Sequence, residues 1–230
     1  VASESAPFVK SGGLGDVVGS LPKALQKKNV DVRVVIPRHR VIKNETMYGV
    51  ELLGEFDVYL QWRKQRAKVL VKPGEVPVYF IENDYYFSRG ALYGFDDDNE
   101  RFAFFGKAVL DMLAMLDFYP DVIHCNDWQT GLIPVYLKER FSQGEFYQGI
   151  KSIITIHNLK FQGIWDIKKV KDITGLPDSY FTPDKLEAYN DANYLKGGIV
   201  YADRVTTVSA TYAEEIKTPF YGEHLDGCTC

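Results

Sequence analysis

The strongest constraint on the fold is the alternation of short apolar runs with amphipathic helical patterns along this 230-residue chain. The runs are rich in β-branched residues and nearly continuous, which is typical of parallel strands covered on both faces. They occupy residues 30–37, 76–81, 121–125, 152–157 and 204–209; helical patterns occupy residues 14–25, 99–118, 128–141 and 186–202. This order predicts an α/β fold with a doubly wound, mainly parallel, Rossmann-like sheet flanked by helices.

One segment departs from the alternation. Residues 54–74 form two alternating runs around a charged turn, which predicts an antiparallel β-hairpin inserted into the sheet. Asn99 is the expected N-cap of the helix over residues 99–118. Pro22 and Pro134 fall inside two other helical patterns and should kink those helices or mark their first turns.

Composition excludes several classes of function. The chain is 46% hydrophobic and 25% charged with a net charge of −4, so it lacks the basic footprint of a nucleic-acid-binding protein. No apolar run approaches the ~20 residues of a membrane span. The three cysteines are an odd, sparse set that favours a reducing compartment. Cys228-Thr229-Cys230 lacks zinc spacing, and we expect no metal or cofactor.

Both ends of the sequence suggest a piece of a longer protein. Residue 1 is Val rather than Met and begins what reads as a buried strand, and the chain stops shortly after a strand and a short helix. We therefore expect a fragment.

Polar residues follow three of the predicted strands. In doubly wound sheets, ligands bind outside the carboxyl ends of the strands. A glycine loop follows a further strand expected at the very start of the chain, "HCNDW" (124–128) follows "DVI", and "HNLKFQG" (157–163) follows "SIITI". We expect these clusters to converge on one rim.

The glycine loop, "KSGGLGD" (10–16), matches neither the G-x-G-x-x-G dinucleotide fingerprint nor the Walker loop. Its glycines could simply supply the positive φ of a tight turn. Alternatively, free amides at the start of the following helix could bind an anion, with Lys10 adding a positive charge. Asp16 would repel a phosphate at contact range, so we expect it to face a sugar hydroxyl or to cap the helix.

Four stretches together, "KSGGLGDVVGSLPKAL", "HCNDWQTGL", "TIHNLKFQG" and "YADRVTTVSATYAEEI", make the chain resemble the bacterial glycogen synthases and plant starch synthases. The resemblance implies a GT-B fold, with residues 1–230 forming the N-terminal Rossmann-like domain and a C-terminal nucleotide-binding domain absent. It implies glucosyl transfer, with retention, from ADP-glucose to the non-reducing end of an α-1,4-glucan. It also implies a location in the bacterial cytoplasm, or in a plastid if the source is a plant.

The resemblance assigns roles residue by residue. Lys10 matches a lysine near the donor diphosphate, and Gly12 and Gly13 match glycines whose amides approach it. Asp16 ends the same signature. Ser11 replaces the commoner Thr.

The later motifs supply the sugar side of the site. Asp127 matches an active-site carboxylate, although it could also N-cap the helix that follows. His157 matches a histidine that contacts the transferred glucose, and Tyr93 a tyrosine that borders the sugar. Asn158 is a second polar residue at this strand end, whereas His124 lies within a strand and is expected to be packed.

Two other functions remain open at this stage. Asp16 and Asp127 could form the carboxylate pair of a glycoside hydrolase, with a separation in one of two ranges, about 5–5.5 Å or 6.5–9.5 Å. The chain could also be a non-catalytic glucan-binding module. The hydrolase alternative leaves unexplained a glycine loop that carries a lysine.

Overall fold

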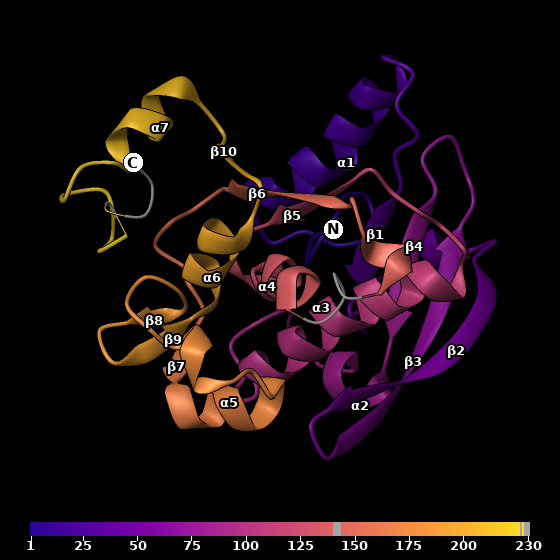
Figure 1. Cartoon of the computed structure of the whole chain (residues 1–230). Coiled ribbons are helices and arrows are strands. Elements are labelled where there is room, and N and C mark those ends of the chain that lie inside the picture. The colour runs from indigo at the N-terminus through magenta and orange to yellow at the C-terminus, as the bar shows by residue number, and fades with distance from the viewer. Residues whose placement is uncertain (140–143, 226, 228–230) are drawn as a thin grey trace. The chain divides into compact units, whose positions relative to one another are not determined.

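The computed structural model describes residues 1–139, 144–225 and 227, and the chain divides into two compact units, Val1–Met115 and Leu116–Cys230 (Figure 1). Each unit contains parallel strands and helices. The α/β class predicted from the alternation of strands and helices is therefore confirmed in both.

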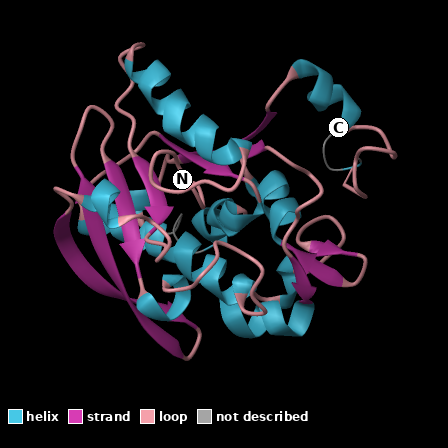
Figure 2. Ribbon diagram, turned by 180° about the vertical axis from the view of Figure 1, so that it is seen from behind, coloured by secondary structure: helices cyan, strands magenta, loops and turns pink. Residues whose placement is uncertain are grey.

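The first unit is built on a four-stranded sheet in the order β1-β4-β3-β2, a continuous twisted surface in Figure 2. β1 (Val34–Pro37) and β4 (Val78–Glu82) pair in parallel, as their apolar sequences predict. β2 (Glu51–Leu60) and β3 (Arg63–Lys72) form the predicted hairpin, and β3 joins it to β4 in antiparallel pairing. The hairpin thus extends a parallel pair.

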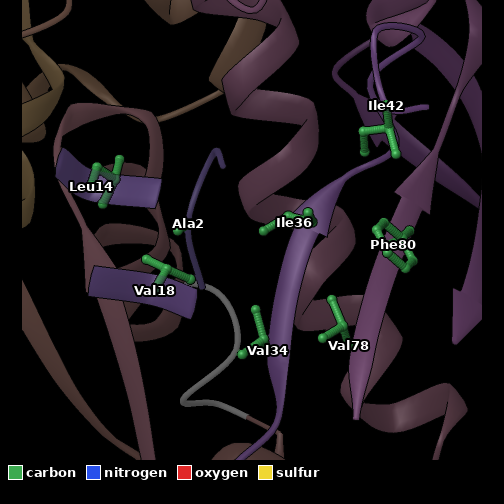
Figure 3. Packing of buried hydrophobic residues seen from close by; sticks show 8 residues of the cluster. All are labelled: Ala2, Leu14, Val18, Val34, Ile36, Ile42, Val78 and Phe80. Atoms are coloured by element: carbon green, nitrogen blue, oxygen red, sulfur yellow. The ribbon is translucent and has the colours of Figure 1, made fainter. Parts of the chain in front are cut away.

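The helices of this unit are α1 (Gly13–Gln26), α2 (Asp84–Phe87) and α3 (Asp98–Met115), with a 3₁₀ turn, η1, at Asn44–Met47. Pro22 lies inside α1. Leu14 and Val18 are one turn apart on α1, and both are buried. They pack in one apolar cluster with Ala2 and with side chains of β1 and β4 (Figure 3). This cluster fixes the start of α1, and with it the glycine loop.

Residues 1–5 run beside β1 but form only an isolated bridge between Ser5 and Val9, so the strand expected at the start of the chain was wrong. The Ala2 amide donates to the Val35 carbonyl at 3.1 Å, and Ala2 lies between α1 and β1 in Figure 3. Residues 2–5 are buried. The segment therefore brings Glu4 beneath the loop that leads into α1.

The predicted N-cap of α3 was wrong by two residues, because the N-cap position is residue 97. The helix begins at Asp98, whose Oδ2 accepts the amides of Gly94 (2.8 Å) and Phe95 (3.2 Å). Asp98 also pairs with the fully buried Arg101. The carboxylate therefore binds the preceding loop, and Asn99 falls inside the helix.

The second unit contains a parallel sheet of β10 (Arg204–Thr207), β6 (Lys151–Ile156) and β5 (Val122–Asn126). All three strands were predicted. The remaining elements surround or follow them: η2 (Trp128–Thr130), α4 (Leu132–Glu139), η4 (Glu145–Tyr147), α5 (Ile167–Thr174), η5 (Asp178–Tyr180), α6 (Tyr194–Tyr201) and α7 (Ala210–Glu215). No helix in the described ranges is both long and apolar enough to cross a bilayer.

Two predicted helices differ from the structure. The pattern over residues 128–141 splits into η2 and α4, with Pro134 in the first turn of α4 and residues 140–141 outside the described residues. The pattern over 186–202 starts as a hairpin of β8 (Glu187–Ala188) and β9 (Asp191–Asn193), and β9 also pairs with β7 (Ile164–Asp166). Tyr189 and Asn190 have φ of 53° and 70°, which a two-residue hairpin turn needs. The helix α6 begins only after Asn193, which caps it through the Lys196 amide.

Candidate active site

The end of the glycine loop and the first half of α1 contain glycines of two kinds. A Cβ at Gly15 would lie 2.5 Å from Lys10 Cβ, and one at Gly19 would lie 2.7 Å from the Ala6 carbonyl oxygen. Close packing therefore requires these two glycines. At Gly12 and Gly13 a Cβ would meet nothing within 4 Å, and neither residue has a positive φ. The tight-turn interpretation is therefore wrong for Gly12 and Gly13.

Glu4 fixes this loop through hydrogen bonds to Ser11 and Gly15. Its side chain is buried; Oε2 accepts the Ser11 amide and the Ser11 hydroxyl, both at 2.7 Å, and Oε1 accepts the Gly15 amide at 3.1 Å. No acceptor among the described residues receives the amides of Gly12 or Gly13. Sequence analysis missed Glu4, although an acidic residue in a strand-like segment just before a glycine loop was a usable signal.

Lys10 and Asp16 form an ion pair on the surface of the loop. Lys10 Nζ donates to Asp16 Oδ1 at 2.9 Å and to Oδ2 at 3.1 Å, and both side chains are more than half exposed. The Asp16 carboxylate binds Lys10 rather than an amide of α1, and the first-turn amide of Gly15 is accepted by Glu4, so the capping role proposed for Asp16 was wrong. Exposed pairs of this kind contribute only about 0–1 kcal/mol, so the pair can open at little cost.

Tyr93 directs its hydroxyl into the first unit. The hydroxyl lies 2.7 Å from Ser3 Oγ and donates to Glu4 Oε2 at 3.3 Å. Burial, followed by the charge of Glu4, raises the pKa of the Tyr93 phenol. The phenol is therefore a neutral donor that supports Glu4.

In the second unit, Asp127 follows β5 and ties it to the end of β6. Its Oδ1 accepts the His157 amide at 2.7 Å, and its own amide donates to the Thr155 carbonyl at 3.0 Å. Asp127 is buried and has φ 56° and ψ −176°, a region that costs about 1–3 kcal/mol for a residue with a side chain. It precedes η2 at the N-cap position without making a side-chain cap bond. The surrounding structure thus holds Asp127 in a strained backbone conformation, with its carboxylate fixed by the His157 amide.

The His157 ring is oriented by Asn126. His157 Nε2 lies 2.9 Å from Asn126 Oδ1, so a hydrogen bond between the two side chains fixes the ring. Asn126 is buried at the end of β5, and sequence analysis did not single it out. Asn158 is exposed, and its Oδ1 accepts the Lys160 amide at 3.1 Å.

His124 behaves as the packed residue that we expected. Its Nε2 lies 2.6 Å from Thr155 Oγ1, which in turn lies 2.7 Å from Thr206 Oγ1. Burial lowers the pKa of His124 to about 4, so the ring is neutral near pH 7. This polar row crosses all three strands of the parallel sheet.

Nothing in the described part of the chain forms a metal site, since no group of three His, Cys, Asp or Glu side chains is suitably placed. Cys125 is buried, and burial raises the pKa of its thiol to about 12. Cys228 and Cys230 lie outside the described residues.

The structure brings together two of the three predicted polar clusters. Asp127, Asn126 and His157 meet at the carboxyl ends of β5 and β6 in the second unit, whereas the glycine loop, Lys10, Asp16 and Tyr93 belong to the first. A helix that starts at a glycine loop, and polar residues at the ends of parallel strands, define an α/β protein of the Rossmann-like, ligand-binding type.

The chain belongs to the starch synthase catalytic domain family, whose sequence profile matches residues 1–229. It is 66% identical over 229 residues to a glycogen synthase of Lachnospira eligens and 56% identical over 229 residues to one of Lachnoclostridium phytofermentans. Each match covers 99% of this chain and 48% of the relative. The chain thus spans about half the length of these relatives.

A solved structure has the same fold. The catalytic domain of Starch Synthase IV from Arabidopsis thaliana, bound to ADP and acarbose, matches with a TM-score of 0.92 and 32% sequence identity. The match covers 98% of this chain and 47% of that chain. The predicted GT-B fold class is confirmed.

Proposed function

We propose that residues 1–230 form the N-terminal, acceptor-side domain of a glucosyltransferase that makes glycogen or starch. The whole protein would transfer glucose, with retention, from ADP-glucose to the non-reducing end of an α-1,4-glucan. A C-terminal nucleotide-binding domain would complete the site. The two named glycogen synthases are bacterial, so of the two locations that the resemblance implies we propose the bacterial cytoplasm.

One observation carries the proposal: the open space over Gly12 and Gly13. Neither packing nor backbone conformation requires glycine there, yet both residues lie at the N-terminal end of a 14-residue helix. Amides at a helix start attract anions, and missing side chains let a diphosphate approach the backbone. Lys10 supplies a positive charge at the same loop once it leaves Asp16.

The cluster in the second unit supplies the sugar side. Sugar transfer builds positive charge on the sugar ring while negative charge grows on the leaving diphosphate. The buried carboxylate of Asp127 would stabilise the positive charge on the sugar, and the loop amides together with Lys10 would stabilise the negative charge on the diphosphate. Asn126 fixes the His157 ring, and the His157 amide fixes the Asp127 carboxylate, before substrate binds. The side chains of His157 and Asp127 therefore lose little conformational freedom in the reaction.

The glycine loop by itself is a weak anion site. Glu4 accepts amides of the loop, and Asp16 accepts from Lys10. Two negative charges therefore lie beside the one positive charge of Lys10. A helix N-terminus contributes only about 0.3–1 kcal/mol when it is exposed to solvent. We therefore expect the isolated chain to fold but to have negligible synthase activity until further cations are added by the missing half.

The test is transfer of labelled glucose from ADP-glucose to glycogen, measured on a protein that contains this chain with its C-terminal continuation and on the isolated chain. We expect incorporation by the longer protein alone. Activity of the isolated chain at a comparable rate would contradict the assignment of domains. Release of free sugar without incorporation would favour a hydrolase, and glycogen binding without turnover by the longer protein would favour a binding module.

A further inference from the structure

The glycine loop is closed at both ends by one buried carboxylate. Glu4 accepts the amide and hydroxyl of Ser11 before the two open glycines, and the amide of Gly15 after them. The loop is therefore fixed on either side of Gly12 and Gly13, whose amides no acceptor among the described residues receives.

The Tyr93 hydroxyl is a fourth donor to this carboxylate, at 3.3 Å. The loop around Tyr93 is itself fixed: Asp98 accepts the amides of Gly94 and Phe95, and Arg101 donates to the Leu92 carbonyl at 3.2 Å. Gly94 has φ +95°, a conformation that suits glycine. Glu4 thus joins the glycine loop to a second loop that is already rigid.

We propose that Glu4 is a positioning residue for the donor diphosphate. It binds the amides of Ser11 and Gly15 and so leaves those of Gly12 and Gly13 as the loop's donors to the ligand. It need not touch the substrate. This inference rests on the proposed function, because it assumes that the diphosphate binds at this loop.

The conservative substitution Glu4→Gln should still disturb the loop, because it changes the hydrogen-bonding groups of the side chain. A glutamine at this position keeps one acceptor oxygen but replaces the other with an NH₂ group. That group would face either the Gly15 amide or the two Ser11 donors, so a donor would oppose a donor. The loop would then shift, and the amides of Gly12 and Gly13 with it.

The experiment compares Glu4→Gln and Glu4→Asp in the longer protein that includes this chain. We expect Glu4→Gln to raise the ADP-glucose KM and the ADP Kd about tenfold or more while the glycogen KM stays unchanged. Glu4→Asp keeps both acceptors and should fall between Glu4→Gln and the parent protein. The Ser11 and Gly15 amides should exchange hydrogen faster in Glu4→Gln.

Two controls separate positioning from general stability. Val69→Ala removes buried apolar volume from β3 of the same unit, outside the cluster that contains Leu14, and Glu55→Gln removes an exposed carboxylate. Both should leave the donor KM unchanged. If Glu4→Gln does not fold, Ser11→Ala, which removes one of the four donors, replaces it, and about a threefold rise in donor KM is expected.

The outcomes distinguish this inference from the proposed function. If Lys10→Ala weakens donor binding but Glu4→Gln behaves like Val69→Ala, the role of Glu4 is wrong. If neither Lys10→Ala nor Gly13→Ala changes donor binding, the diphosphate is misplaced and the proposed function fails at this loop.

Discussion

The two candidate clusters, one in each unit, are built in different ways. In the first unit, the groups that would meet the ligand are backbone amides in open space, and the side chains beneath them only fix the loop. In the second unit, the groups are side chains, and each is already held by a neighbour: Asp127 by the His157 amide, His157 by Asn126.

This difference suits the two charges of the reaction. A growing diphosphate charge is spread over several oxygens, and a row of amides can meet it without exact placement of any side chain. The sugar carries a localised charge, which needs one carboxylate at one position. The account therefore predicts that side-chain changes do most damage in the second unit, and backbone changes in the first.

The largest effect is expected at Asp127. Asp127→Asn keeps an acceptor for the His157 amide, and asparagine tolerates positive φ better than most residues. Stability should change little, while kcat of the longer protein falls by about 10²-fold or more because the charge is lost. Steady-state kinetics and thermal unfolding on the same samples test this.

Asp203 provides the matched control for Asp127. Its Oδ2 accepts the Ser152 amide at 2.8 Å at the opposite end of β6, so it is also a carboxylate that binds a backbone amide of this strand. Asp203→Asn should leave kcat unchanged. An Asp127→Asn variant that loses activity only in proportion to its stability would instead support a structural role.

The next effect is expected at Lys10. Lys10→Ala removes a charge-assisted contact with the diphosphate, so kcat/KM for ADP-glucose should fall by about 10- to 100-fold. Both kcat and donor affinity should change, since charge on the leaving group grows in the transition state. Lys23→Ala, an exposed lysine on the last turn of α1, is the control. Equal kinetics for the two variants would contradict the phosphate assignment.

A third prediction contrasts two glycines of the same loop. Gly15→Ala places a methyl group 2.5 Å from Lys10 Cβ, and such overpacking should cost about 1–3 kcal/mol of stability. Gly13→Ala has open space in the first turn of α1, so stability should hold or rise while donor affinity falls. Urea unfolding and ADP titration on both variants measure the contrast. Loss of stability in Gly13→Ala would show that this glycine is a packing residue.

The smallest effect concerns pH. Burial lowers the pKa of His39 to about 4, and its buried ring lies 2.9 Å from the Ser3 carbonyl. As the pH falls, the unfolded state therefore protonates His39 before the folded state does. The contribution of His39 to the free energy of unfolding is fully present above pH 6.5 and is lost as the pH falls towards 4. His39 alone should account for about 2 kcal/mol of the loss by pH 5, and His124, whose pKa burial also lowers to about 4, adds to it, so His39→Gln should reduce the loss without abolishing it. His224→Gln, at an exposed position, should leave the pH dependence unchanged.

Sequence analysis predicted the strands well because each carries its own continuous apolar signal. It failed at residues 186–193, where an apolar pattern continuous with a helix was overridden by a turn at Tyr189 and Asn190. It found the glycine loop but not Glu4, and Asp127 but not Asn126. Glu4 and Asn126 act through hydrogen bonds to Ser11 and His157, and these pairs come together only when the chain has folded.

The central claim is that the amides of Gly12 and Gly13 form part of a diphosphate site that is incomplete in this chain. The most direct measurement is an ADP titration of the 230-residue chain followed by amide NMR. We predict weak, millimolar-range binding, since the exposed helix end contributes only about 0.3–1 kcal/mol, with the largest shifts at Gly12, Gly13 and Leu14. Tight binding, or shifts that leave these three amides unmoved, would contradict the account.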